Sequence, residues 1–157
     1  MLAAPCFIVL KVLGMEIKRT ALVLHPAMDM FRLVQDVPAY PEFLTWCLKS
    51  EVHEQTPEHQ LASLVVRVSG ITQTFTTRNR FVPGERLTLS LVDGPFQHFS
   101  GEWLFETLGQ EGSKVTLVLS FDFSSRMLSS AFRRGFTHIA DRLVSEFSKR
   151  ADHVYGS

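Results

Sequence analysis

The sequence predicts an α+β fold of the helix-grip type, in which a curved antiparallel sheet holds a long C-terminal helix and two short helices follow the first strand. Residues 126–150 repeat apolar side chains every three or four positions, which is the period of a helix with one buried face. Residues 60–123 instead alternate apolar and polar side chains in runs separated by Gly and Pro, as antiparallel strands do. A helix with so broad an apolar face needs a second layer to cover it, and the sheet provides that layer.

The predicted C-terminal helix carries one apolar stripe, and its charged residues fall largely on the opposite face. The stripe, together with the residues that widen it on one side, consists of Leu128, Phe132, Phe136, Ile139, Leu143 and Phe147, with Met127, Ala131, Ala140 and Val144. This face is expected to pack on the sheet.

Residues 1–14 are predicted to be a leader outside the folded domain, either disordered or not translated, because Met15 directly precedes the first strand pattern. Their apolar run is too short to span a bilayer, and it lacks both a preceding basic region and a following cleavage site. A weak membrane-surface anchor is the alternative. The domain is expected to span residues 15–156.

Within the domain, the first strand is expected at residues 16–24 and ends at His25-Pro26. Pro26 begins a short helix, because a missing N–H is harmless at the first helical position. Pro38 ends this helix, and a second short helical turn is expected at residues 42–44.

About six further strands follow, separated by turns that contain Gly or Pro. A polar loop is expected at residues 53–59, and Gly101 is expected to mark a bend or bulge that curls the sheet. The strands are expected at residues 46–54, 61–69 and 71–81 and around Leu87 to Leu91, Phe99 to Phe105 and Val115 to Phe123.

The composition limits the classes of function that this chain can have. The 157 residues make one domain with 45% apolar and 20% charged residues, and they carry a formal net charge of +0. Because the chain is neutral overall, its net charge does not favour DNA binding. The chain has 13 Phe and only 2 Tyr, which predicts an interior or cavity wall of rings without hydrogen-bonding groups.

No catalytic or metal site is predicted. The six histidines are scattered, and His53 and His59 lack the spacing of a helical metal pair. Cys6 and Cys47 are far apart and are expected to be reduced thiols of a cytosolic protein. No nucleophile motif or phosphate-binding glycine loop is present.

Several blocks of the sequence resemble the START-like coenzyme Q-binding family, including its bacterial branch of ribosome association toxins. Residues 36–47, DVPAYPEFLTWC, fit the pattern D-V-x-x-Y-P-x-F-x-x-W-C. Further blocks match in the right order at residues 75–79, 91–96, 101–105 and 147–156.

The resemblance implies a START/Bet v 1-like fold with an apolar cavity under the long helix. It implies that ubiquinone or a similar lipid is bound as a ligand, not as a catalytic cofactor, in support of respiratory electron transport. The alternative it implies is a toxin that binds the large ribosomal subunit and inhibits translation initiation. The protein is expected to be cytoplasmic, with a peripheral position at the inner membrane as a further option. Cyclase activity is not expected, because a shared fold does not carry chemistry.

The resemblance and the ring-rich strands together predict the ligand-binding residues. The predicted cavity wall consists of Phe43, Trp46, Phe75, Phe99, Trp103, Phe105, Phe121, Phe132 and Phe136. The predicted head-group contacts are Gln73, Thr77 and Asn79, which share the strand face of Phe75. The alternatives are that the rings are ordinary core and that the polar groups serve buried backbone atoms. Residues 40–47 are either a tight turn or a lid.

The last predicted helix is also basic, and Arg133, Arg134 and Arg142 are its candidate contacts to ribosomal RNA or an anionic membrane. The alternative is a solvated helix face. Residues 126–150 are net positive because they carry six cations and only two anions. The cations are Arg126, Arg133, Arg134, Arg142, Lys149 and Arg150, and the anions are Asp141 and Glu146.

Overall fold

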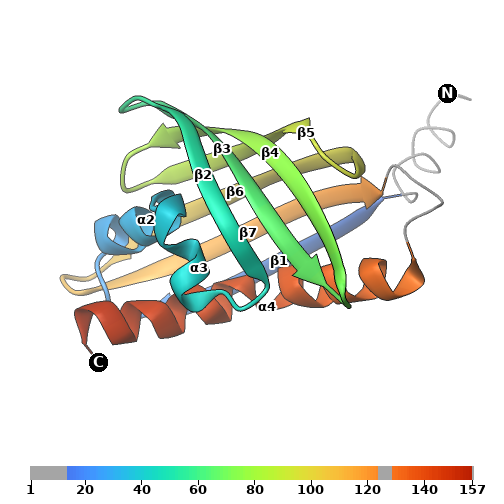
Figure 1. Cartoon of the computed structure of the whole chain (residues 1–157). Coiled ribbons are helices and arrows are strands. Elements are labelled where there is room, and N and C mark those ends of the chain that lie inside the picture. Colours follow the sequence, from blue (N-terminus) through green and yellow to red (C-terminus); the bar gives the residue numbers. More distant parts are fainter. Residues whose placement is uncertain (1–13, 124–128, 157) are drawn as a thin grey trace, which may run out of the picture.

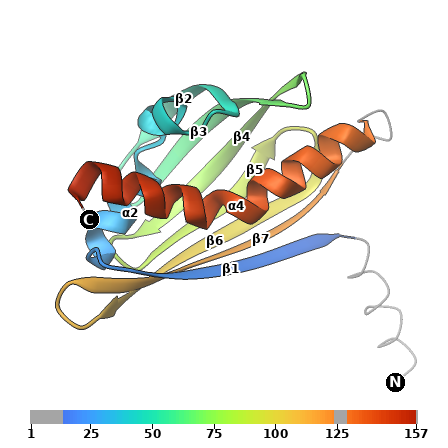
Figure 2. The ribbon, with the colours of Figure 1, turned by 90° about the horizontal axis from the view of Figure 1, so that it is seen from below.

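A computed structural model describes residues 14–123 and 129–156 of the chain. Its seven strands form one antiparallel sheet in the order β1-β7-β6-β5-β4-β3-β2, which curves around the C-terminal helix α4 (Ser130–Tyr155) (Figure 1). The two short helices lie beside one end of α4, and β1 runs along its other side (Figure 2). The predicted helix-grip fold is therefore confirmed.

The remaining elements follow the predicted order. The strands are β1 (Met15–Val23), β2 (Cys47–Gln55), β3 (His59–Val68), β4 (Ile71–Val82), β5 (Arg86–Asp93), β6 (Phe96–Leu108) and β7 (Gly112–Phe123). The short helices are α2 (Ala27–Gln35), the 3-10 turn η1 (Val37–Ala39) and α3 (Tyr40–Phe43).

Helix α4 starts and ends where its capping residues require. The Ser129 side chain accepts a hydrogen bond from the Phe132 backbone N–H at 3.1 Å, which is an N-cap interaction. The helix continues beyond the predicted end at residue 150 because Ala151 still belongs to the buried stripe. It ends before Gly156, which has a φ of 85°. The predicted start, residues 126–128, lies outside the described residues.

The predicted polar loop at residues 53–59 is wrong over most of its length. Only residues 56–58 separate β2 from β3, and the backbone N–H of Thr56 donates to the carbonyl of His59 at 2.8 Å. Strand β2 is an edge strand with exposed side chains, so its polarity reflects solvent exposure and not a loop.

Of the bend or bulge expected at Gly101, the bulge is absent from the described sheet. Gly101 pairs in regular register with Leu89 and Leu119, and the nearest irregularity lies between Phe96 and His98. A Cβ on residue 101 would lie 2.7 Å from Leu119 Cδ2, so the glycine permits close packing of neighbouring strands.

Candidate functional site

A mostly apolar cavity lies between the concave face of the sheet and α4, with a volume of about 80 Å³. None of the residues that line it is charged. Residues predicted as cavity wall do line it in part, namely Trp46, Phe75, Phe99, Trp103 and Phe136. The sequence thus brought these rings together correctly, while ligand contact itself stays a prediction.

Two predicted wall residues on the strands lie outside the cavity because other rings cover them. Phe105 packs edge-on against Phe31 of α2, with ring centroids 5.8 Å apart. Phe121 is fully buried and meets the edge of Phe136 at 5.3 Å. Both face inward as expected, but they fill the core at the two sides of the cavity.

The other two predicted wall residues that miss the cavity are Phe43 and Phe132. Phe132 stacks on Phe136 at 6.2 Å and is fully buried in the core. Phe43 is half-buried, with Phe147 edge-on at 5.2 Å and the Arg150 guanidinium 4.9 Å from its ring centroid. Phe43 therefore covers the outside of the cavity wall.

Several residues that line the cavity were not among the predicted ligand contacts. Most are aliphatic, and a search for rings overlooked them. The signal was present, since Leu117 and Leu119 alternate with polar neighbours and Ile139, Leu143 and Phe147 repeat at helical spacing.

The cavity has a polar region built from a chain of buried amides. Thr77 and Asn79 line the cavity and are 8% and 3% exposed. Thr77 Oγ1 donates to Asn79 Oδ1 at 2.8 Å, and Asn79 Nδ2 donates to Gln60 Oε1 at 2.8 Å. Gln60 Nε2 in turn donates to the Gln35 backbone carbonyl at 3.1 Å. Gln73, the third predicted head-group contact, is half-buried and does not line the cavity.

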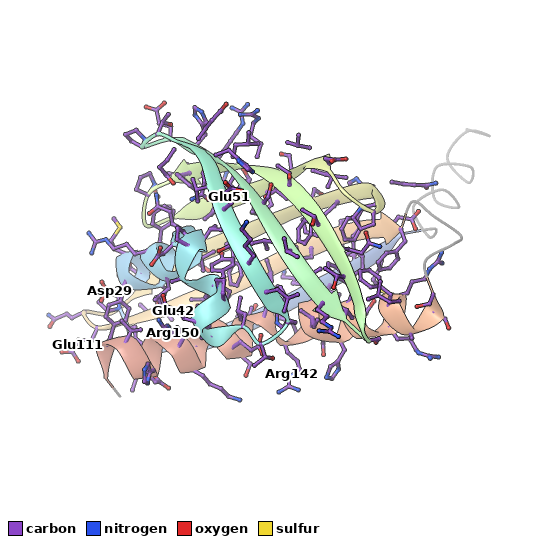
Figure 3. All side chains as sticks on the ribbon, viewed as in Figure 1. Asp29, Glu42, Glu51, Glu111, Arg142 and Arg150 are labelled. Carbon is purple, nitrogen blue, oxygen red and sulfur yellow. The ribbon has the colours of Figure 1, made fainter. Side chains whose placement is uncertain are left out.

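Residues 37–46, here called the flanking segment, close the cavity on one side and are joined to α4 by side chains. Arg150 of α4 pairs with Glu42 at 3.2 Å, and Figure 3 shows the two side by side. The indole N–H of Trp46 donates to Glu146 Oε2 at 3.2 Å. Within the described residues no backbone hydrogen bond crosses from this segment to α4, so side-chain contacts alone hold this boundary.

Three cations lie on the exposed side of α4, here called the basic stripe: Arg134, Arg142 and Lys149. Arg142 points away from the sheet (Figure 3). The other cations predicted there are used elsewhere, because half-buried Arg133 lies over the Phe123 ring and Arg150 pairs with Glu42. Arg126 lies outside the described residues.

The acidic residues of α4 turn toward the rest of the fold. Asp141 pairs with Arg19 of β1, and Glu146 accepts from Trp46. The exposed side is therefore more uniformly basic than the sequence count suggests, although it carries fewer cations.

The family model described as polyketide cyclase/dehydrase and lipid transport matches residues 23–148 of the chain. The chain belongs to this family. It is 45% identical over 141 residues to the ribosome association toxin RatA of Vibrio cholerae, covering 90% of this chain and 98% of that protein. It is 38% identical over 151 residues to RatA of Escherichia coli, covering 96% of each. The predicted START-like family and its RatA branch are thus confirmed.

The chain also has more distant similarities, one to a curated protein and one to a solved structure. Coenzyme Q-binding protein COQ10 homolog B of Xenopus laevis is 27% identical over 151 residues, covering 93% of this chain and 57% of that protein. The structure of the Zhui aromatase/cyclase from a Streptomyces species has a TM-score of 0.78 at 21% identity, covering 88% of this chain and 94% of that chain. Such a structural likeness shows the fold alone.

Two titratable groups of residues 40–47 in this START-like chain are kept neutral by burial. Burial raises the pKa of Cys47 to about 11, so its thiol stays protonated at neutral pH and is a weak nucleophile. Burial, with smaller contributions from Cys47 and Asp36, also raises the pKa of Tyr40, whose hydroxyl donates to the Val34 carbonyl at 2.5 Å.

In the part of the chain that the structure describes, no cluster of His, Cys, Asp and Glu is suited to hold a metal ion. Over the same residues, no helix combines the length and apolarity needed to cross a bilayer.

Proposed function

We propose that this chain acts on the ribosome, as a toxin that binds the large subunit and inhibits translation initiation. The observation that carries the proposal is the 45% identity to RatA of Vibrio cholerae over 98% of that protein's length. The name of that relative states ribosome association, and the alignment includes nearly the whole fold. We propose no catalytic step, because the residues that line the cavity are uncharged and the neighbouring Cys47 thiol stays protonated.

The basic stripe supports this proposal physically. The stripe follows one side of α4, since a helix turns about 100° per residue and this places its three cations about 20° to 80° apart around the axis. The stripe runs from Arg134 through Arg142 to Lys149 and is roughly 22 Å long. A row of exposed cations on a rigid helix suits the phosphates of an RNA backbone. Such contacts add affinity and steer association, and they weaken as salt rises.

The test is cosedimentation of the full chain with ribosomal subunits in sucrose gradients, together with growth after induced expression. We expect the double variant Arg134→Glu/Arg142→Glu to lose binding and growth arrest. The slope of log affinity against log salt should fall by about 1 for each phosphate contact removed. Both side chains are exposed, so the fold should survive.

The matched control is Arg86→Glu/Lys114→Glu. It makes the same charge change on the convex side of the sheet, where both residues pair with exposed glutamates. This control should bind and arrest growth like the wild type. A wild-type chain that neither cosediments nor arrests growth would contradict the proposed function. Retained binding by the folded Arg134→Glu/Arg142→Glu variant would contradict only the interface on α4.

The cavity favours a second candidate function, the binding of an apolar ligand of the ubiquinone type. Its lining is uncharged and rich in rings, as lipid sites are. Its volume of about 80 Å³ is below the roughly 300 Å³ of ordinary ligand pockets. A lipid would therefore enter only if the flanking segment moved away from α4, which breaks the side-chain contacts described above. In this proposal the segment serves as a lid.

We expect protein purified from a quinone-producing host to yield a lipid on organic extraction, identified by mass spectrometry. Ala140→Leu should reduce the yield several-fold, because Ala140 lines the cavity and the added carbons fill it. Ala131→Leu makes the same change on the same helix outside the cavity and should leave the yield unchanged. A folded wild-type chain that carries no lipid and takes up no added quinone would rule out this second function.

A further inference from the structure

The buried amide chain beside the cavity has a fixed hydrogen-bond direction. The Gln35 backbone carbonyl can only accept, so the Gln60 amide nitrogen must face it. Gln60 Oε1 therefore accepts from Asn79 Nδ2, which leaves Asn79 Oδ1 facing Thr77. The Thr77 hydroxyl must then donate to Asn79. A backbone carbonyl of α2 thus sets the orientation of every group up to the cavity wall.

This direction decides what Thr77 offers to the cavity. Its only proton is used by Asn79, so its oxygen can act toward a ligand only as an acceptor. The same holds for Tyr40, which also lines the cavity and donates its proton to the Val34 carbonyl. The indole N–H of Trp46 is likewise used, by Glu146. The hydroxyl groups of Thr77 and Tyr40 can therefore only accept a hydrogen bond from a ligand.

We propose that the cavity selects an uncharged apolar ligand that carries a hydroxyl group, and that Thr77 recognises that hydroxyl as a hydrogen-bond acceptor. This inference rests on the ligand-binding function proposed above. A ligand hydroxyl can donate to Thr77 Oγ1 and still accept from the second N–H of Asn79, whereas a ligand carbonyl can only accept. A carboxylate or phosphate meets no charged partner at this wall, so fatty acids and phospholipid head groups are disfavoured.

The inference also predicts which of two redox forms of a quinone, the ligand class expected from the sequence, binds more tightly. A reduced hydroquinone carries hydroxyls, and an oxidised quinone carries carbonyls in the same positions. The reduced form is therefore expected to bind more tightly. The protein would then hold the lipid preferentially as an electron donor, without itself carrying out an electron transfer.

The test uses benzyl alcohol, benzaldehyde and ethylbenzene, which match in size and differ in hydrogen-bonding capacity. Binding is measured by calorimetry on the full chain carrying Leu143→Ala, which adds room at the cavity wall for these rings. We expect benzyl alcohol to bind about tenfold more tightly than benzaldehyde, the effect of one hydrogen bond. Adding Thr77→Val should remove this preference, and adding Thr77→Ser should keep it.

Every other outcome contradicts either this inference alone or the ligand-binding function as well. Equal binding of the alcohol and the aldehyde, or a preference that survives Thr77→Val, would overturn the inference while leaving ligand binding intact. Preference for benzaldehyde would also overturn it and would indicate that a donor of the cavity wall, such as the indole N–H of Trp103, sets the selectivity. If no probe binds to folded protein, including ethylbenzene, the ligand-binding function fails as well. If Leu143→Ala does not fold, Ile139→Ala opens the same wall.

Discussion

Replacing Phe147 by Ala is expected to lower the free energy of unfolding by about 3–5 kcal/mol. Phe147 is 2% exposed and sits where α4, the flanking segment and the sheet meet. Its ring contacts Tyr40 at 5.4 Å, Phe43 at 5.2 Å and Trp103 at 5.3 Å, all edge-on. Removing the ring deletes these contacts and leaves a hole continuous with the existing cavity, which has no side chain to refill it.

Urea denaturation of wild type and variant measures this loss directly. Phe147→Leu is the matched control, because it keeps an apolar side chain and should cost less than half as much. Phe147 also lines the cavity, so Phe147→Ala should take up ethylbenzene more readily than the wild type while losing stability. Equal stability of Phe147→Ala and wild type would show that α4 does not pack on the flanking segment as described.

Replacing Gly94 by Ala is expected to destabilise the fold by about 2–4 kcal/mol, from an unfavourable backbone conformation and from overpacking. Gly94 has a φ of 153°, which L-residues rarely adopt. An added Cβ would lie 2.6 Å from Phe75 Cβ and 3.3 Å from Phe75 Cα. Because Phe75 Cα belongs to a paired strand, it cannot move aside cheaply. The turn before β6 and the cavity wall would both shift.

Gly109→Ala is a comparison variant in which the steric contact is absent. Gly109 also has a positive φ, 63°, but its Cβ would meet nothing within 4 Å. Thermal unfolding of both variants should therefore show a larger loss for Gly94→Ala, and the difference combines the contact with Phe75 and the less favourable backbone conformation at φ 153°. Equal losses would contradict the expected clash between an added Cβ at residue 94 and Phe75. A ligand probe should bind more weakly only to Gly94→Ala, since Phe75 lines the cavity.

Local sequence patterns were sufficient for the elements whose burial follows one period. Phe132, Phe136 and Phe147 are buried on α4 as the helical spacing predicts. The strict alternation of β7 likewise places Leu117 and Leu119 inward. The same reasoning failed at residues 53–59, because a polar edge strand and a polar loop expose side chains equally and differ only in backbone pairing.

The wall of the cavity was only partly predictable, because facing inward is a property of one strand while lining a space depends on its neighbours. Phe99 and Phe105 lie on the same face of β6, yet only Phe99 lines the cavity and Phe105 is covered by Phe31. The helix that supplies this cover, α2, precedes β6 by about 60 residues in the chain. No local pattern contains that contact.

The sequence by itself determined the helix-grip fold, the START-like family and the basic character of the last helix, since these depend on periodicity and on ordered blocks of residues. Only the tertiary structure decided which cations stay exposed, because Arg150 is paired by Glu42 from a distant segment. It also decided the hydrogen-bond direction at the cavity. That direction arises where Gln35 at the end of α2 meets Gln60, and the register of β3 and β4, a long-range property, places Gln60 opposite Asn79.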